Sequence, residues 1–475
     1  MSDDPSPDPR ISRVFDLQKE HARKLRTESP ANRIQRLKAL KKWIEKNEYL
    51  IQKAIYRDFK KPALEVDMSD IYPVLTELKD ALHNLKKWMR STPVDSSVAY
   101  FSTTSHIRYE PRGVCLIIAP WNFPFNLTIG PLVSAIAAGN TIMIKPSEMT
   151  PNTSEVIDKM VGEIFKEEEV AVFTGDVEVS KELLKLPFDH IFFTGSPAVG
   201  KAIMKAAAEH LTSVTLELGG KSPTVVDANV NIGDAAKKIA WGKFMNNGQT
   251  CVAPDYVLIH KSVKKSFIEA LRDQTEKMFN GKGNDFVQSE DYARIVNERH
   301  YKRIQELVQD AVKKGASVAF GNETRAEDNF ISPTVLTDVS PDTEIMEEEI
   351  FGPVLPVVEY ENFDDVIDII NRKPKPLALY YFGRSKKRRK KLISSTSSGG
   401  VCINDCVLHF GHPNLPFGGV NNSGIGKSHG KYGFLAFSNE KAVLKQRVGF
   451  TTTKMVYPPY TKRVRSILHL LKRYF

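Results

Sequence analysis

Cysteine is scarce in this chain: residues 115, 251, 402 and 406 are the only cysteines among 475 residues. Four are too few for a disulfide framework, and this scarcity favours a reducing compartment. Cys402 and Cys406 lack the second cysteine pair or histidine cluster that a zinc site needs. We therefore interpret them as packing residues and expect no metal site.

Long hydrophobic runs are also lacking. No apolar stretch reaches the roughly 18 residues that a membrane-spanning helix needs. The first residues are acidic and proline-rich, without the basic end and apolar core of a secretory signal. We predict a disordered leader over residues 1–10 and a cytoplasmic protein. Internal repeats are absent from the sequence as well.

The length and composition indicate an ordinary globular protein with more than one core. A chain of 475 residues is too long for one simple core, so we expect two large lobes and a cleft. The hydrophobic content of 41% and charged content of 26% are typical of globular domains. A net charge of +10 favours anionic partners such as dinucleotides, membranes or nucleic acid without choosing among them.

Alternation of short apolar runs with helical stretches indicates an α/β fold. Residues 11–92 are mostly helical by spacing, and Val114–Ala119 is uninterrupted and apolar, like a strand covered on both faces. The alternation that follows predicts right-handed βαβ units and parallel sheets. A second series begins at Tyr256, and we place the boundary between the lobes at Glu217. The further strands that we predict cover residues 141–144, 170–173, 190–193, 214–218, 256–260, 317–320, 354–360, 377–382 and 400–403, and one long helix covers 293–314.

Cys251 is the residue around which we organise the chemistry. It lies between a predicted helix, residues 233–246, and a predicted strand at 256–259, so its thiol is held in a tight connection. A thiolate attacks carbonyl carbons well. A lone cysteine is more often a small buried hydrophobe, so its neighbours in the fold decide the interpretation.

Asn122 and Glu217 supply the partners that attack on an aldehyde needs. The tetrahedral adduct carries an oxyanion, and the Asn122 amide, with the backbone N–H of Cys251, can donate to it. Hydrolysis of the resulting thioester needs a general base, and Glu217 stands at the end of a buried strand, where burial would raise its pKa. Taken singly, Asn122 also fits a turn and Glu217 a surface or paired carboxylate.

Oxidation of the adduct needs a hydride acceptor, which points to a nicotinamide cofactor. A G-x-G-x-x-G fingerprint is absent after the first strands, but Gly195 to Gly200 opens a helix after a strand and can hold a pyrophosphate. Lys145 and Glu148 follow another strand and can bind ribose hydroxyls. Since Glu148 would repel a 2′-phosphate, NAD is favoured over NADP.

Six stretches, in this order, resemble the NAD(P)-dependent aldehyde dehydrogenase superfamily over residues 11–445. They are Pro120-Trp121-Asn122-Phe123-Pro124, Lys145-Pro146-Ser147-Glu148, Phe193-Thr194-Gly195-Ser196, Glu217-Leu218-Gly219-Gly220-Lys221, Gly248-Gln249-Thr250-Cys251 and Glu349-Ile350-Phe351-Gly352-Pro353-Val354. The resemblance implies Cys251 as nucleophile, Glu217 as general base and Asn122 as oxyanion donor. It implies a cofactor site made of Trp121, Lys145, Glu148, Gly195, Ser196, Pro197, Ala198, Val199, Gly200, Leu218, Gly219, Glu349 and Phe351.

Four further stretches look like the class 3 branch, which acts on fatty and aromatic aldehydes. They are Asp58-Phe59-Lys60-Lys61-Pro62, Ala253-Pro254-Asp255-Tyr256, Asn414 to Val420, and Ser423-Gly424 with His429-Gly430-Lys431. The resemblance implies two Rossmann-like lobes plus a small β element for oligomerisation, a homodimer, and tolerance of NADP. The implied domains are 11–216 for NAD binding (with 91–110 contributing to oligomerisation), 217–420 for catalysis, 421–453 for a site loop and oligomerisation strand, and 454–475 for a basic tail.

Two basic segments leave alternatives open. The run Lys386 to Lys391 could be an import signal or nucleic-acid patch, but its helical surroundings favour a solvated helix face, so we expect no nucleic-acid partner. The tail has Val464, Ile467, Leu468, Leu471 and Phe475 at helical spacing between basic residues, which permits docking on protein or weak contact with a membrane surface.

Two alternative functions remain beside aldehyde oxidation. A CoA-acylating relative would resolve the thioester with a thiol, which the retention of Glu217 disfavours. An inactive relative could act as a basic surface-binding protein.

Overall fold

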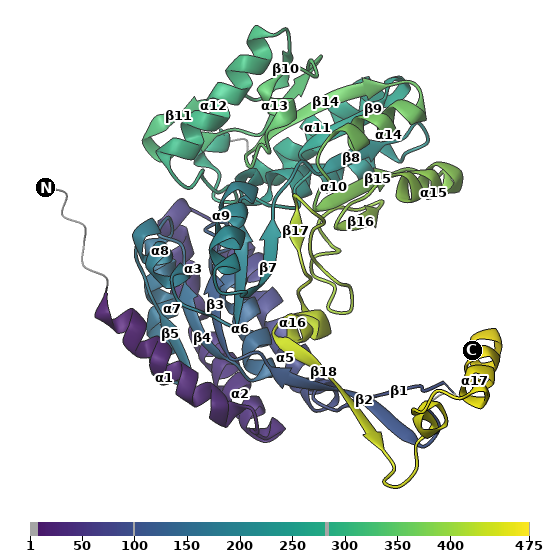
Figure 1. The fold of residues 1–475 in the computed structure, drawn as a ribbon. Helices are drawn as coiled ribbons and strands as arrows, with labels where there is room; N and C mark the ends of the chain where they lie inside the picture. Colours follow the sequence, from purple (N-terminus) through teal and green to yellow (C-terminus); the bar gives the residue numbers. More distant parts are fainter. Residues whose placement is uncertain (1–7, 98–99, 281–284, 475) are drawn as a thin grey trace, which may run out of the picture.

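The computed structural model describes residues 8–97, 100–280 and 285–474. It has two α/β lobes, one above the other in Figure 1, and an arm of antiparallel strands that leaves the lower, first lobe. The predicted α/β fold with parallel sheets is confirmed.

Helices begin the first lobe. Helix α1 starts at Pro9 because the Asp8 carboxylate accepts from the backbone N–H of Arg10, and proline suits the first helical position. The predicted leader is therefore wrong for Pro9 and Arg10, while residues 1–7 lie outside the described chain. The helices that follow are α2 (Pro30–Lys46), α3 (Glu48–Phe59), α4 (Ala63–Val66), a π-helical turn (Asp67–Ile71) and α5 (Tyr72–Trp88).

The first lobe contains a six-stranded sheet in the order β17-β7-β6-β3-β4-β5. All residues of β3 and β4 are buried, as expected of strands covered on both faces. Its strands are β3 (Val114–Ile118), β4 (Thr141–Lys145), β5 (Val170–Val172), β6 (His190–Gly195), β7 (Ser213–Leu218) and β17 (Gly424–Ile425), and its helices are α6 (Asn126–Ala138), α7 (Pro151–Ile164), α8 (Val177–Leu184) and α9 (Pro197–Ala208). Among the described strands of this sheet, only β17 is antiparallel to its neighbour, and it places Gly424 opposite Glu217.

The second lobe contains a seven-stranded sheet in the order β10-β13-β14-β9-β8-β15-β16. Its strands are β8 (Pro223–Val226), β9 (Tyr256–His260), β10 (Ser317–Phe320), β13 (Thr334–Thr337), β14 (Val354–Tyr360), β15 (Ala378–Phe382) and β16 (Gly400–Ile403). The short strands β8 and β13 were not predicted. The helices include α10 (Ile232–Phe244), α11 (Lys264–Phe279), α12 (Glu298–Lys313), α14 (Phe363–Arg372) and α15 (Lys386–Ser395).

The predicted helix over residues 293–314 is wrong for its first five residues, since α12 begins at Glu298. The backbone of this stretch bonds instead to the loop before Cys251. The Gln249 side chain donates to the Arg294 carbonyl at 3.0 Å and accepts from the Val296 N–H at 3.0 Å. Residues 293–297 thus brace the loop before Cys251.

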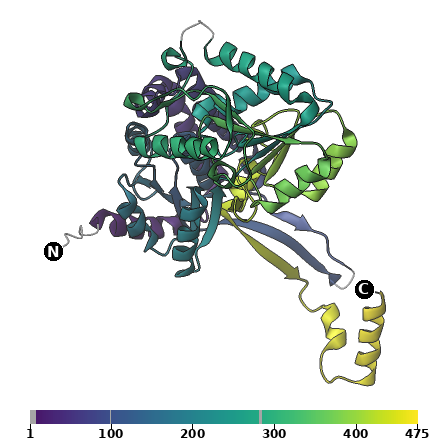
Figure 2. The same cartoon turned by 90° about the horizontal axis from the view of Figure 1, so that it is seen from above.

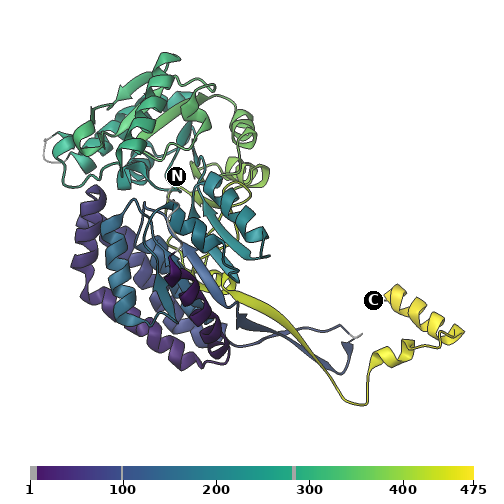
Figure 3. The same cartoon turned by 60° about the vertical axis from the view of Figure 1, so that its left-hand side comes forward.

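The arm consists of β1 (Thr92–Val94), β2 (Thr103–Pro111) and β18 (Ser438–Gln446), paired antiparallel. It projects well away from both lobes, and helix α17 (Lys462–Tyr474) lies at its far end (Figures 2 and 3). Helix α17 contacts the 3-10 turn Thr452–Val456. Within the described ranges, no helix is both long and apolar enough to span a bilayer.

Candidate active site

Cys251 follows a loop whose backbone is held in an unusual conformation. Asn246 and Asn247 are buried with φ of 53° and 54°, a left-handed region that asparagine tolerates better than most residues. Gly248 has φ of 72°, and a Cβ there would lie 2.2 Å from the Gly352 carbonyl oxygen. The close contact explains why glycine precedes the Gln249-Thr250-Cys251 sequence.

Asn122 is bonded directly to this loop. Its side-chain Nδ2 donates to the Gln249 carbonyl at 3.1 Å, and Asn246 Nδ2 donates to the Asn122 carbonyl at 2.8 Å. Because an amide NH₂ carries two hydrogens, one remains for a ligand. The structure therefore brings Asn122 and Cys251 together, as predicted from the two separate stretches.

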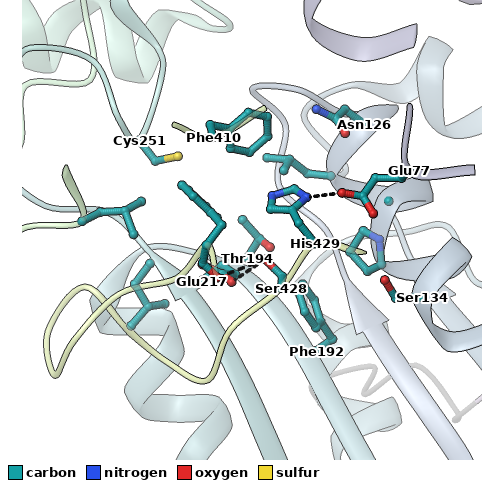
Figure 4. Close-up of a pocket in the computed structure, with 16 residues that line it drawn as sticks. Glu77, Asn126, Ser134, Phe192, Thr194, Glu217, Cys251, Phe410, Ser428 and His429 are labelled. Atoms are coloured by element: carbon teal, nitrogen blue, oxygen red, sulfur yellow. Dashed lines mark hydrogen bonds and ion pairs between the residues drawn. The ribbon is translucent and has the colours of Figure 1, made fainter. Parts of the chain in front are cut away.

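Glu217 lies at the end of β7 with its carboxyl group buried (Figure 4). The Ser428 hydroxyl donates to Glu217 Oε1 at 2.8 Å, whereas Oε2 is buried and has no partner among the described residues. Burial raises the pKa of Glu217 to about 7, although the Ser428 hydrogen bond opposes the rise. A carboxyl with a pKa near neutrality and one unbonded oxygen suits proton transfer.

The Cys251 thiol is protonated at neutral pH. Burial, followed by the charges of Glu349 and Glu217, raises the pKa of Cys251 to about 12. Attack by the sulfur thus needs a base to accept the Sγ proton. Glu217 and Cys251 line the same inner cavity of about 40 Å³, shown in Figure 4.

Glu349 faces the glycines that follow Glu217. A Cβ on Gly219 would lie 2.1 Å from Glu349 Oε2, so only glycine leaves room for the carboxyl. Burial, then the charge of Asp255, raises the pKa of Glu349 to about 8. Reasoning from strand positions missed Glu349, and only the family resemblance indicated it.

A buried ion pair holds the segment that carries Glu349. Lys221 pairs with Asp255 and also donates to the carbonyls of Ile345 and Glu348, both at 2.7 Å. The other Asp255 oxygen accepts from the Ile350 N–H at 3.0 Å. One pair therefore joins the segments that follow Glu217 and Cys251 to the segment around Glu349.

A cleft of about 560 Å³ between the lobes fits a dinucleotide. Ser196 caps α9, because its hydroxyl accepts from the Val199 N–H at 3.4 Å and its carbonyl from the Gly200 N–H at 2.9 Å. Since Pro197 has no N–H, the described contacts leave the Ala198 N–H of that first turn for a phosphate. The Trp121 ring lies 5.3 Å from the Phe351 ring, centre to centre. The cleft is lined by Trp121, Asn122, Gly195, Ser196, Pro197, Ala198, Glu217, Leu218, Gly219, Cys251, Glu349 and Phe351, among others.

Four predicted cofactor residues do not line this cleft. Val199 and Gly200 belong to the first turn of α9, and Gly200 packs against Leu218. Lys145 and Glu148 form an ion pair at 2.5 Å at the end of β4. Lys145 and Glu148 are not among the residues that line this cleft, so their place in the cofactor site stays a prediction.

A second cavity of about 280 Å³ also reaches Cys251 and is mainly apolar. Phe123 and Phe410 line it, whereas Trp121 lines the cofactor cleft. Its other apolar lining residues are Met68, Tyr72, Pro73, Leu127, Trp241, Met245, Val252, Val407, Leu408 and Pro413.

His429 and Glu77 are the polar pair of this apolar cavity, and sequence reasoning did not find their roles. His429 Nδ1 lies 2.8 Å from Glu77 Oε1 (Figure 4). Burial alone would lower the pKa of His429, but the hydrogen bond and charge of Glu77 outweigh it and the pKa is raised. Their signal in the sequence is weak because Glu77 and His429 lie on distant segments.

The model of the aldehyde dehydrogenase family matches residues 9–443. The chain belongs to the aldehyde dehydrogenase family. It is 43% identical over 444 residues to 4,4′-diaponeurosporen-aldehyde dehydrogenase of Staphylococcus aureus, covering 93% of this chain and 94% of that one. It is 44% identical over 428 residues to aldehyde dehydrogenase family 3 member A2 of Pongo abelii, covering 90% and 87%. The predicted likeness to class 3 is thereby confirmed.

Solved structures confirm the fold and the cofactor class of this aldehyde dehydrogenase. The substrate-bound state of Staphylococcus aureus AldH matches with a TM-score of 0.92 and 41% identity over 97% of this chain and 99% of that one. The NAD⁺ complex of an aldehyde dehydrogenase from Bacillus cereus matches at 0.83 and 28%, covering 92% and 88%. A GapN from Methanocaldococcus jannaschii with NADP matches at 0.83 and 26%, covering 92% and 94%. The chain is an NAD(P)-dependent enzyme of aldehyde oxidation.

Proposed function

We propose that this aldehyde dehydrogenase oxidises medium-chain, long-chain or aromatic aldehydes to carboxylic acids, with Cys251 as nucleophile. The observation that carries the proposal is the position of Cys251, which lines both the apolar cavity and the cofactor cleft. An apolar cavity of about 280 Å³ suits an aliphatic chain or a ring. The name of the relative that acts on 4,4′-diaponeurosporen-aldehyde supports a large apolar substrate.

Three residues carry the chemistry. Glu217 accepts the Sγ proton as Cys251 bonds to the aldehyde carbon, and the Asn122 amide with the Cys251 N–H donates to the oxyanion. NAD or NADP, when bound, supplies the hydride acceptor. Glu217 releases that first proton to solvent, accepts a proton from the water that attacks the thioester carbon, and returns it to the sulfur as the C–S bond breaks, which releases the acid and restores the thiol.

The cofactor-binding assignments follow the two sides of the cleft. Gly195 to Gly200 would hold the pyrophosphate at the start of α9, and Glu349 and Phe351 would contact the nicotinamide half. Trp121, Leu218 and Gly219 line the space between. Lys145 and Glu148 would bind the adenine ribose, with NAD favoured over NADP because of the Glu148 charge.

The arm and tail support proposals about assembly. We assign the domains as predicted, with 11–216 for NAD binding, 217–420 for catalysis and the arm strands for oligomerisation. The outer edge of β18, in the sheet order β1-β2-β18, is suited to pairing with a second copy, which gives a homodimer. Helix α17 carries the basic residues Lys462, Arg463, Arg465, Lys472 and Arg473. We place the protein in the cytoplasm, where such a helix can touch an anionic membrane surface.

The decisive measurement is reduced cofactor and carboxylic acid formed by wild type and Cys251→Ala from an aliphatic aldehyde series, without CoA. Wild type is expected to turn over, while the variant loses more than about 10³-fold of the rate. Activity only after CoA is added would replace hydrolysis by acyl transfer to CoA. Silence under both conditions would favour a binding protein.

A further inference from the structure

A buried charge cluster lies beneath the catalytic loops, outside the residues assigned above. It consists of Lys61, which precedes α4, Glu65 on α4, and Asp70 on the π-helical turn that follows. Lys61 Nζ lies 2.6 Å from Asp70 Oδ2, and both of these side chains are fully buried. Burying three charged groups is costly unless each has a partner, so their contacts indicate what they hold.

Glu65 holds the loop that carries the nucleophile. Its Oε1 accepts from the backbone N–H of Asn246 at 2.7 Å. Asn246 has a left-handed backbone, so its N–H needs an acceptor from elsewhere in the fold. The Asn246 side chain in turn donates to the carbonyls of Asn122 and Gln249 at 2.8 and 3.1 Å. One carboxyl thereby reaches both the Asn122 backbone and the Cys251 loop through a single residue.

Lys61 and Asp70 hold the loop that carries the oxyanion donor. Lys61 Nζ lies 4.2 Å from the centre of the Phe123 ring, directly after Asn122. Asp70 Oδ1 accepts from the Asn126 N–H at 3.3 Å, and Asn126 Nδ2 donates to the Ser69 carbonyl at 2.9 Å. The cluster thus fixes the chain on the C-terminal side of Asn122.

Among the three residues of the cluster, Glu65 is the one whose side-chain length matters most. Lys61 offers one positive charge to two carboxyl groups, and it is bonded to Asp70. Burial raises the pKa of Glu65 to about 7, against the Lys61 charge and the Asn246 N–H. Glutamine has the same length and can accept the same hydrogen bond without charge, whereas aspartate keeps the charge and falls short of Asn246.

We propose that Glu65 is a positioning residue that sets the distance between the Asn122 amide and the Cys251 sulfur, with Lys61 and Asp70 as its support. This inference rests on the proposed function, because it assumes that Asn122 and Cys251 act on the same adduct. A displacement of about 1 Å in such a pair is enough to cost on the order of 10²-fold in rate.

The test compares Glu65→Gln with Glu65→Asp in the full-length enzyme. We expect kcat for aldehyde oxidation to fall about tenfold or more in Glu65→Asp and to stay within about threefold of wild type in Glu65→Gln. The KM for the cofactor should change less than about twofold in both. On an Asn122→Ala background, Glu65→Asp should cost less than about twofold, because the distance it disturbs no longer matters.

Two results would overturn the inference. The reverse order, with Glu65→Gln more damaged than Glu65→Asp, would mean that the charge matters and not the reach. A Glu65→Asp loss that multiplies in full with that of Asn122→Ala, or that follows a lower Tm, would mean a structural role. If wild type itself reduces no cofactor with any aldehyde, the proposed function fails instead, and the two failures remain distinct.

Discussion

The apolar cavity and the cofactor cleft meet at Cys251, but one is lined mainly by side chains and the other largely by backbone. The cleft is lined by strand ends, glycines and a helix start, where the backbone itself approaches the ligand. The apolar cavity is lined by side chains from α5, α10 and the segment 407–413. Backbone-lined sites need particular residues at fixed spacing, whereas a side-chain lining only needs apolar bulk. The first kind is therefore readable in a sequence and the second is not.

We expect the largest loss of rate from substitutions near the place where the two cavities meet, and Glu217→Gln tests this. The variant should lose about 10² to 10⁴ of the steady-state rate because glutamine cannot accept a proton. In wild type, only deprotonated Glu217 is active, so kcat should rise as pH rises through about 7. A pH profile of kcat for both proteins measures this.

Glu349→Gln is the matched control, because the Glu349 carboxyl is also buried with a raised pKa, to about 8. Whatever rate it retains, its kcat should still rise through about pH 7. If kcat of Glu217→Gln still rises through about pH 7, Glu217 is not the general base and the group that titrates lies elsewhere.

Trp241→Ala should affect the apolar cavity and leave the cofactor cleft unchanged. Trp241 lines the cavity from α10, so its loss should lower kcat/KM roughly 10- to 100-fold for a long aliphatic aldehyde and only a few-fold for a short one. Steady-state kinetics with both aldehydes measure the ratio. Tyr49→Ala, at an exposed aromatic on α3, serves as control. Equal losses for long and short aldehydes would show general damage and contradict the assignment.

Glu148→Ala should affect the cofactor side alone, with the smallest effect of the three. Removing the carboxylate that we propose to face the 2′-phosphate of NADP should raise the NADP to NAD ratio of kcat/KM about tenfold. The aldehyde preference should stay constant. Glu155→Ala, an exposed carboxylate on α7, is the control. An unchanged cofactor ratio would place Glu148 away from the ribose and reduce the cofactor site to the residues that line the cleft.

The sequence predicted the fold and the residues of the cofactor cleft better than the residues of the apolar cavity. Uninterrupted apolar runs such as Val114–Ile118 identify buried parallel strands, and β8 and β13 were missed because each holds only two consecutive aliphatic residues. Asn122, Glu217 and Cys251 were predicted as a set because each role requires a specific residue type beside a turn, and all three line the cofactor cleft. His429, Glu77 and Glu65 were not, because their roles come from contacts with segments far along the chain.

Strand β17 has a consequence for synthesis on the ribosome. The edge of the first sheet at β7 is paired by β17, and Ser428 reaches Glu217 from the same late segment. Roughly 200 residues of the second lobe are translated between these strands, which takes about 10 to 40 s at ordinary elongation rates. During that time the first lobe has an open strand edge beside Glu217, the proposed base. The nascent chain therefore emerges with its active site assembled last, at the stage when chaperone protection of that edge matters most.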